Sequence, residues 1–172
     1  MIQIKNAADL QKMRKACAIS AAALKAGGEA IEPGITTAEI DKIIYDFIVR
    51  HGARPNFLHL YGFPATACIS VNDTVIHGIP NKQQQIRPGD IVSIDTGCKI
   101  DGFNGDNACT YACGKIDLEA QRLLDVTKEG LHRGIEMARG GNRVGDIGHA
   151  VQSYVEENGF SVVRSFVGHG VG

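Results

Sequence analysis

Residues 91–113 read IVSIDTGCKIDGFNGDNACTYAC, a sequence that predicts two strands joined by a tight turn. The turn falls at Asp101-Gly102, because an Asp-Gly pair between two β-rich runs is a strong signal for a two-residue hairpin. A two-residue turn at this place pairs Ile100 with Phe103. The register of the whole hairpin follows from that first pair.

Each predicted strand carries one aspartate, Asp95 in the first and Asp106 in the second. In this register Asp95 faces Ala108, and Asp106 lies one diagonal step away on the same face, about 7 Å from Asp95 between Cβ atoms. Two close carboxylates repel, so such a pair normally needs a cation or a shared proton. The hairpin therefore predicts a pair that one metal ion could contact, and the alternative is two exposed polar positions on a one-sided sheet.

The alternation of side chains assigns one face of the hairpin to a cleft and the other to the core. The predicted cleft face is small and polar, with Ser93, Asp95, Gly97, Asn104, Asp106, Ala108 and Thr110. The predicted core face carries Val92, Ile94, Cys109, Tyr111 and Cys113.

Composition indicates one globular domain over residues 1–172, since 44% of the chain is apolar and the net charge is −1. The basic residues form no stripe, which argues against a nucleic-acid partner. No apolar run approaches 18 residues and no signal-peptide core is present, so we expect a cytoplasmic protein without a membrane segment. The five cysteines include no C-x-x-C pair and fit neither a disulfide framework nor a zinc knuckle, so most are expected in the core.

Apolar periodicity predicts four helices and, outside the hairpin, three further strands. The helices are expected after Asn6 and ending at Gly27-Gly28, after Thr36 or Thr37 and ending at Gly52, after Asp117, and from about residue 144 to Asn158. The expected core stripe of the first is Leu10, Met13, Cys17, Ala21 and Leu24, and that of the third is Leu123, Leu124, Thr127, Leu131 and Ile135. The further strands are expected at 67–72, 74–77 and 160–166.

An internal repeat relates the two halves of the chain. Gly141 lies 107 residues after Gly34, and at this offset GITTAEIDKIIYDFIVRHG falls on GNRVGDIGHAVQSYVEENG with matching apolar positions and flanking glycines. Two unrelated amphipathic helices would also share periodicity. If the match is a duplication, the first repeat covers about 1–113 and the second about 114–172, and the second is cut short.

Four motifs together resemble those of the type I methionine aminopeptidases, members of the pita-bread metallopeptidase superfamily. They are VNDTVIHGIP at 71–80, RPGDIVSIDTG at 87–97, DGFNGDNACT at 101–110 and GHGVG at 168–172. The resemblance covers essentially the whole chain. It implies an α+β fold in which a pseudo-two-fold repeat places helices on a curved antiparallel sheet, with the second repeat incomplete.

The resemblance also implies the roles of individual residues. Asp95 resembles a metal-chelating aspartate, Asp106 one that bridges two metal ions, and His169 an imidazole ligand, while His77 resembles a histidine that hydrogen-bonds the scissile amide or the tetrahedral intermediate. The loop 53–67 would supply pocket walls. The implied walls of the methionine pocket are Phe57, Phe63 and Cys68, although Leu60 stands where the family usually has a tyrosine.

The implied activity is removal of the N-terminal methionine from nascent proteins with a small second residue, by attack of a hydroxide held between two divalent ions of Mn, Fe, Co or Zn. Three of the family's five protein ligands fall within residues 1–172, so we expect at most one weakly held ion and low activity. We also expect a monomer. Two alternatives are a binding module of the same fold that has lost its chemistry and a proline-specific peptidase of the same superfamily. A lone histidine such as His77 is by itself more often structural than catalytic.

Overall fold

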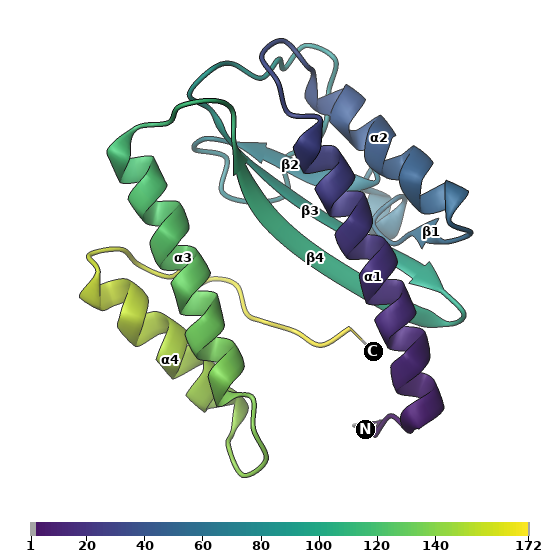
Figure 1. Ribbon diagram of the computed structural model, residues 1–172, viewed down its shortest axis with the longest axis vertical. Coiled ribbons are helices and arrows are strands. Elements are labelled where there is room, and N and C mark those ends of the chain that lie inside the picture. Colours follow the sequence, from purple (N-terminus) through teal and green to yellow (C-terminus); the bar gives the residue numbers. More distant parts are fainter. Residues whose placement is uncertain (1–2, 172) are drawn as a thin grey trace. The chain divides into compact units, whose positions relative to one another are not determined.

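A computed structural model describes residues 3–171 as an α+β arrangement (Figure 1). The elements are α1 (Ala7–Glu29), α2 (Thr37–Arg50), β1 (Arg54–Pro55), the 3-10 helix η1 (Leu60–Gly62), β2 (Ala67–Val71), β3 (Ile91–Ile100), β4 (Phe103–Ala112), α3 (Leu118–Met137) and α4 (Val144–Glu157). The chain divides into two compact units. The first holds residues 3–116 with 170–171, and the second holds residues 117–169.

The sheet of the first unit is built around β3, which pairs antiparallel with β4 along one edge and with β1 and β2 along the other. The predicted hairpin register is confirmed, because Ile100 pairs with Phe103 and Asp95 with Ala108. Asp101 and Gly102 both have positive φ, 53° and 86°, as the favoured two-residue hairpin turn requires. Sequence alone therefore predicts the sheet register that places the two aspartates.

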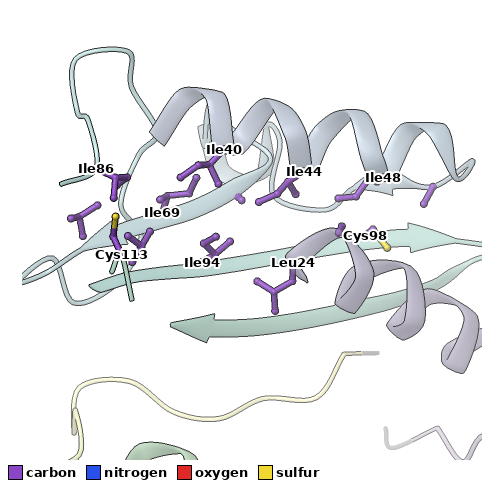
Figure 2. Close-up of a cluster of buried hydrophobic side chains, with 14 residues drawn as sticks. Leu24, Ile40, Ile44, Ile48, Ile69, Ile86, Ile94, Cys98 and Cys113 are labelled. Carbon is purple, nitrogen blue, oxygen red and sulfur yellow. The ribbon is translucent and has the colours of Figure 1, made fainter. Parts of the chain in front are cut away.

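Helices α1 and α2 lie on one face of this sheet, α1 over β3 and β4 and α2 over β1 and β2 (Figure 1). Both begin with a capping box, at Asn6, as expected for the cap, and at Thr36, one of the two expected cap positions. Figure 2 shows the core between α2 and the strands. Its fully buried side chains include Ile40, Ile44, Ile48, Ile69, Ile94 and Cys98.

The predicted end of α1 at Gly27-Gly28 is wrong, because the helix continues to Glu29. Both glycines are buried, and they serve close packing rather than termination. A Cβ atom on Gly28 would lie 2.2 Å from the ring of Tyr111. The predicted stripe is also partly wrong, since Leu10 and Ala21 are exposed. The buried residues of α1 are Ala16, Ser20, Ala23, Leu24, Gly27 and Gly28.

The predicted core stripe of α3 is largely exposed. Leu131 and Ile135 are each 58% exposed, whereas Val126, Gly130 and Gly134 are buried. Within the second unit α4 packs on the glycine side of α3, because the missing side chains allow the two helices to approach closely. The apolar pattern on α3 was therefore correct for a helix and wrong for the face that this unit buries.

Helix pairs in the two units pack in the same way. A Cβ atom on Gly27 of α1 would lie 2.7 Å from Ile44 and 3.5 Å from Ile40 of α2. A Cβ atom on Gly134 of α3 would lie 2.8 Å from Val151 and 3.5 Å from Ile147 of α4. Gly134, Ile147 and Val151 lie 107 positions after Gly27, Ile40 and Ile44, respectively. The predicted repeat is therefore supported at the level of individual contacts.

Two predicted strands are absent, and one residue of the predicted core face of the hairpin is exposed. Residues 74–77 form an irregular loop in which His77 has a φ of 57°, a value that breaks an extended strand. Residues 160–166 are not a strand, because the second unit, described in full, contains two helices and no strand to pair with. Cys109 is exposed, whereas Cys68, Cys98 and Cys113 are buried as free thiols.

Candidate metal and peptide site

The polar face of the sheet brings Cys68, Asp95 and Asp106 together. Cys68 is the Cα partner of Asp95 across β2 and β3, and Asp106 is the partner of Gly97 across β3 and β4. Side chains alternate along each strand, so the two carboxylates share a face and lie one diagonal step apart. Both aspartates are half-buried. The geometry that the sequence predicts for this pair is therefore present in the fold.

Gly97, the strand partner of Asp106, lies close to the aromatic ring of Phe57. A Cβ atom on Gly97 would lie 3.2 Å from Cε1 of Phe57 and 3.3 Å from Nδ2 of Asn56. The backbone N–H of Asn56 donates to the carbonyl of Gly97 over 2.9 Å, which fixes this loop to β3. Phe57, one of the expected pocket residues, thus lies next to Gly97, the strand partner of Asp106.

The charges of the two aspartates reach the Cys68 thiol. Burial, followed by the charges of Asp95, Asp106 and Asp41, raises the pKa of Cys68 to about 11. The thiol therefore stays protonated at neutral pH. A neutral, buried thiol is suited to the wall of an apolar pocket, the role expected for Cys68.

The loop 56–64 before β2 is held in a strained conformation. His59 and Tyr61 have φ values of 69° and 50°, and the Tyr61 side chain is fully exposed. The N–H of His59 donates to the carbonyl of Phe63 over 2.8 Å, and the N–H of Leu60 donates to that of Phe57 over 2.9 Å. These bonds bring the two ends of the loop, with the half-buried Phe57 and Phe63, toward each other. Strain of this kind is concentrated at functional sites in proteins.

Asp41 of α2 is a member of this region that the sequence did not single out. Its Oδ1 accepts hydrogen bonds from the backbone N–H groups of Thr66 and Ala67, over 2.9 Å and 2.8 Å. It thereby fixes the start of β2 at Ala67, the residue before Cys68. Burial raises the pKa of the Asp41 carboxyl, although the two backbone hydrogen bonds lower it. In the sequence Asp41 is one polar position of an amphipathic helix, and no local signal marks it.

His169 belongs to the second unit and His77 to the loop after β2, and both side chains are exposed. Among residues 3–171 no three His, Cys, Asp or Glu side chains gather in a group that could hold a metal ion. Within the first unit the structure brings the aspartate pair together, whereas His169 belongs to the other unit. Two carboxylates on one polar face are hard oxygen donors, a donor type that suits divalent ions. The donor chemistry of the pair thus fits a metal site.

Comparison with known families gives a consistent result. The sequence pattern of metallopeptidase family M24 matches residues 11–172. The chain is 51% identical to the methionine aminopeptidase of Clostridium perfringens and 45% identical to methionine aminopeptidase 1 of Bacillus subtilis. In both cases all 172 residues align with 69% of the relative's length.

Solved structures agree in fold. The crystal structure of methionine aminopeptidase from Rickettsia prowazekii superimposes with a TM-score of 0.96 at 40% identity, over 99% of this chain and 68% of that one. Aminopeptidase P of Escherichia coli superimposes with a TM-score of 0.78 at 23% identity, which shows a shared fold only. The expected pita-bread fold is therefore confirmed.

No helix within the described part of the chain is long and apolar enough to cross a membrane.

Proposed function

The chain belongs to metallopeptidase family M24 and is a metalloaminopeptidase, and we propose that it releases the N-terminal methionine of proteins whose second residue is small. Relatives of 40–51% identity that are named methionine aminopeptidases support an N-terminal methionine as the residue released. The single observation that carries the proposal is the confirmed hairpin register. It places Asp95 and Asp106 on one polar face beside Cys68 and Phe57.

Asp95, Asp106 and His169 are proposed as the residues that hold a divalent ion. When bound, such an ion supplies Lewis acidity that activates water and polarises a carbonyl. Two carboxylates and one imidazole suit Mn, Fe, Co or Zn. Three protein donors with water in the remaining positions are enough for one ion held weakly, so we propose at most one such ion in this chain and a low rate of turnover.

Phe57, Phe63 and Cys68 are proposed to receive the methionine side chain. All three are at least half-buried, and Cys68 lies directly across β2 and β3 from Asp95. An apolar wall beside a carboxylate pair suits a peptide whose first residue has an unbranched apolar side chain and a positively charged N-terminal amine. Leu60, which is 49% exposed, lies between Phe57 and Phe63 in the chain and would border this pocket.

His77 is proposed to hydrogen-bond the scissile amide or the tetrahedral intermediate. An exposed imidazole can reach a bound peptide and can hydrogen-bond it through a ring nitrogen. Its exposed position on a loop next to β2, the strand that carries Cys68, is consistent with this role. The monomeric state and the cytoplasmic location stay predictions.

The function is tested by methionine release from the peptide Met-Ala-Ser, with Mn²⁺ supplied to the 172-residue chain. We expect slow but measurable release, lost in His77→Ala and much reduced for Met-Lys-Ser. Turnover as fast as that of the Bacillus subtilis relative would refute the proposed low activity. Absence of release from both peptides would refute the aminopeptidase proposal for this chain.

A further inference from the structure

The loop of residues 72–78 leaves β2 and returns to the same strand, and its outgoing end is fastened to β3. The N–H of Asn72 donates to the carbonyl of Ile91, and the N–H of Ile91 donates to Oδ1 of Asn72, each over 3.0 Å. Nδ2 of Asn72 also donates to Oδ1 of Asp90 over 2.8 Å. Three hydrogen bonds therefore fix the point where the loop begins.

The returning end is fastened to β2 at Gly78. The N–H of Ile69 donates to the carbonyl of Gly78 over 2.9 Å, and the N–H of Gly78 donates to Oγ of Ser70 over 3.1 Å. A Cβ atom on Gly78 would lie 2.1 Å from the carbonyl oxygen of Ile69, so only glycine can lie this close to the strand. Gly78 is thus held by one backbone and one side-chain hydrogen bond, and it can make both because it has no Cβ atom.

His77 directly precedes this anchored glycine and has a left-handed backbone, with a φ of 57°. A non-glycine residue adopts this conformation at an energetic cost, so the surrounding contacts must hold it there. The outgoing anchor lies five residues away, whereas Gly78 is the next residue in the chain. Of these two anchors, the one at Gly78 therefore constrains the backbone of His77 more closely.

We propose that Ser70 is a positioning residue for His77. The Ser70 side chain is 3% exposed and lies on the polar face, in the strand pair that also carries Cys68 and Asp95. Its hydroxyl oxygen accepts the Gly78 N–H and so connects β2 to the residue that follows His77. The inference rests on the proposed function only in that the imidazole must meet a bound peptide. The anchoring itself is a property of the loop.

A neighbouring hydroxyl provides a matched control. Ser93 is the Cα partner of Ser70 on β3, and its Oγ shares a hydrogen bond of 2.7 Å with Oγ1 of Thr110. Ser93→Ala and Ser70→Ala each delete one serine hydroxyl that makes one hydrogen bond. Only the Ser70 hydroxyl is hydrogen-bonded to the loop. Ser70→Thr keeps the hydroxyl and suits a strand position, so it serves as the conservative rescue.

The experiment is amide hydrogen exchange and NOE spectroscopy on the isotopically labelled 172-residue chain. In Ser70→Ala we expect the Gly78 amide to exchange on the order of tenfold faster or more. We also expect His77 to lose the strong intraresidue HN–Hα NOE that marks a positive φ. Ser70→Thr should restore both signals, and Ser93→Ala should change neither. An unchanged Gly78 amide and His77 NOE in Ser70→Ala would overturn the proposal, as would equal changes in Ser93→Ala.

Kinetics separates this proposal from the proposed function. For Met-Ala-Ser with Mn²⁺, a positioning role predicts that Ser70→Ala lowers kcat by about tenfold while KM stays within about twofold, because a catalytic group is displaced without loss of the substrate pocket. If His77→Ala releases methionine as fast as the original chain, the catalytic role of His77 fails. The exchange and NOE results would then still decide whether Ser70 holds His77.

Discussion

Asp41 offers a sharp test of how β2, and with it Cys68, is held in place. Asp41→Ala removes the acceptor of the Thr66 and Ala67 N–H groups, and both residues are buried. A buried donor left without a partner costs about 1–3 kcal/mol. Partial access of water to this half-buried site reduces the sum, so we expect a loss of about 2–4 kcal/mol in the free energy of unfolding.

The matched control is Asp46→Ala in the same helix. Asp46 pairs with Lys42 over 2.7 Å at the surface, and an exposed i,i+4 pair contributes about 0.3–0.5 kcal/mol. Urea unfolding followed by circular dichroism measures both variants, with unchanged m-values as the check that the two-state analysis holds. Equal losses for the two variants would refute the role assigned to Asp41.

The pH dependence of the same site has a definite sign. Burial raises the pKa of Asp41 above its ordinary value of 3.8, so the folded chain binds this proton more tightly than the unfolded chain does. The stability from this group is therefore greatest in acid and is lost as the pH rises through the folded pKa. Asp41→Asn keeps an oxygen acceptor and does not titrate. We expect the stability of the original chain relative to Asp41→Asn to fall as the pH rises from 3 toward 7, and a rise would contradict the assignment.

Two further predictions concern packing and thiol chemistry. Gly28→Ala places a Cβ atom against the Tyr111 ring and should destabilise the chain by about 1–3 kcal/mol, whereas Gly148→Ala meets no atom within 4 Å and should be neutral or stabilising in thermal unfolding. Iodoacetamide at pH 8 should modify the exposed Cys109 well before Cys68, because burial and nearby carboxylates raise the pKa of Cys68 to about 11. Peptide mapping by mass spectrometry measures the order of modification. Modification of Cys68 before Cys109 would contradict this prediction.

The hairpin could be predicted because its determinants are local. An Asp-Gly turn sets the register, and the pleat then sets which side chains share a face, so the positions of Asp95 and Asp106 follow without tertiary information. Helix starts are equally local, since Asn6 and Thr36 satisfy the first N–H groups of their own helices.

The features that could not be predicted depend on contacts between distant segments. Gly27 and Gly28 have the composition of a helix end, but the approach of Ile44 and Tyr111 shows that they are sites of close packing. The return of the loop to β2 depends on the fit of Gly78 against Ile69, which no sequence pattern records. Apolar periodicity found α3 as a helix but not its buried face, because that face is set by the helix that packs on it.

The central claim is that the polar face of the β3–β4 hairpin holds a metal ion. Titration of Mn²⁺ into the 172-residue chain, followed by calorimetry, tests it directly with three variants. Asp101→Asn is the control, because Asp101 is a carboxylate of the same hairpin that pairs with Lys15 at the turn. We expect at most one weakly bound ion in the original chain and in Asp101→Asn, and loss of binding in Asp95→Asn and in Asp106→Asn. Binding that is equal in all four proteins would contradict the claim.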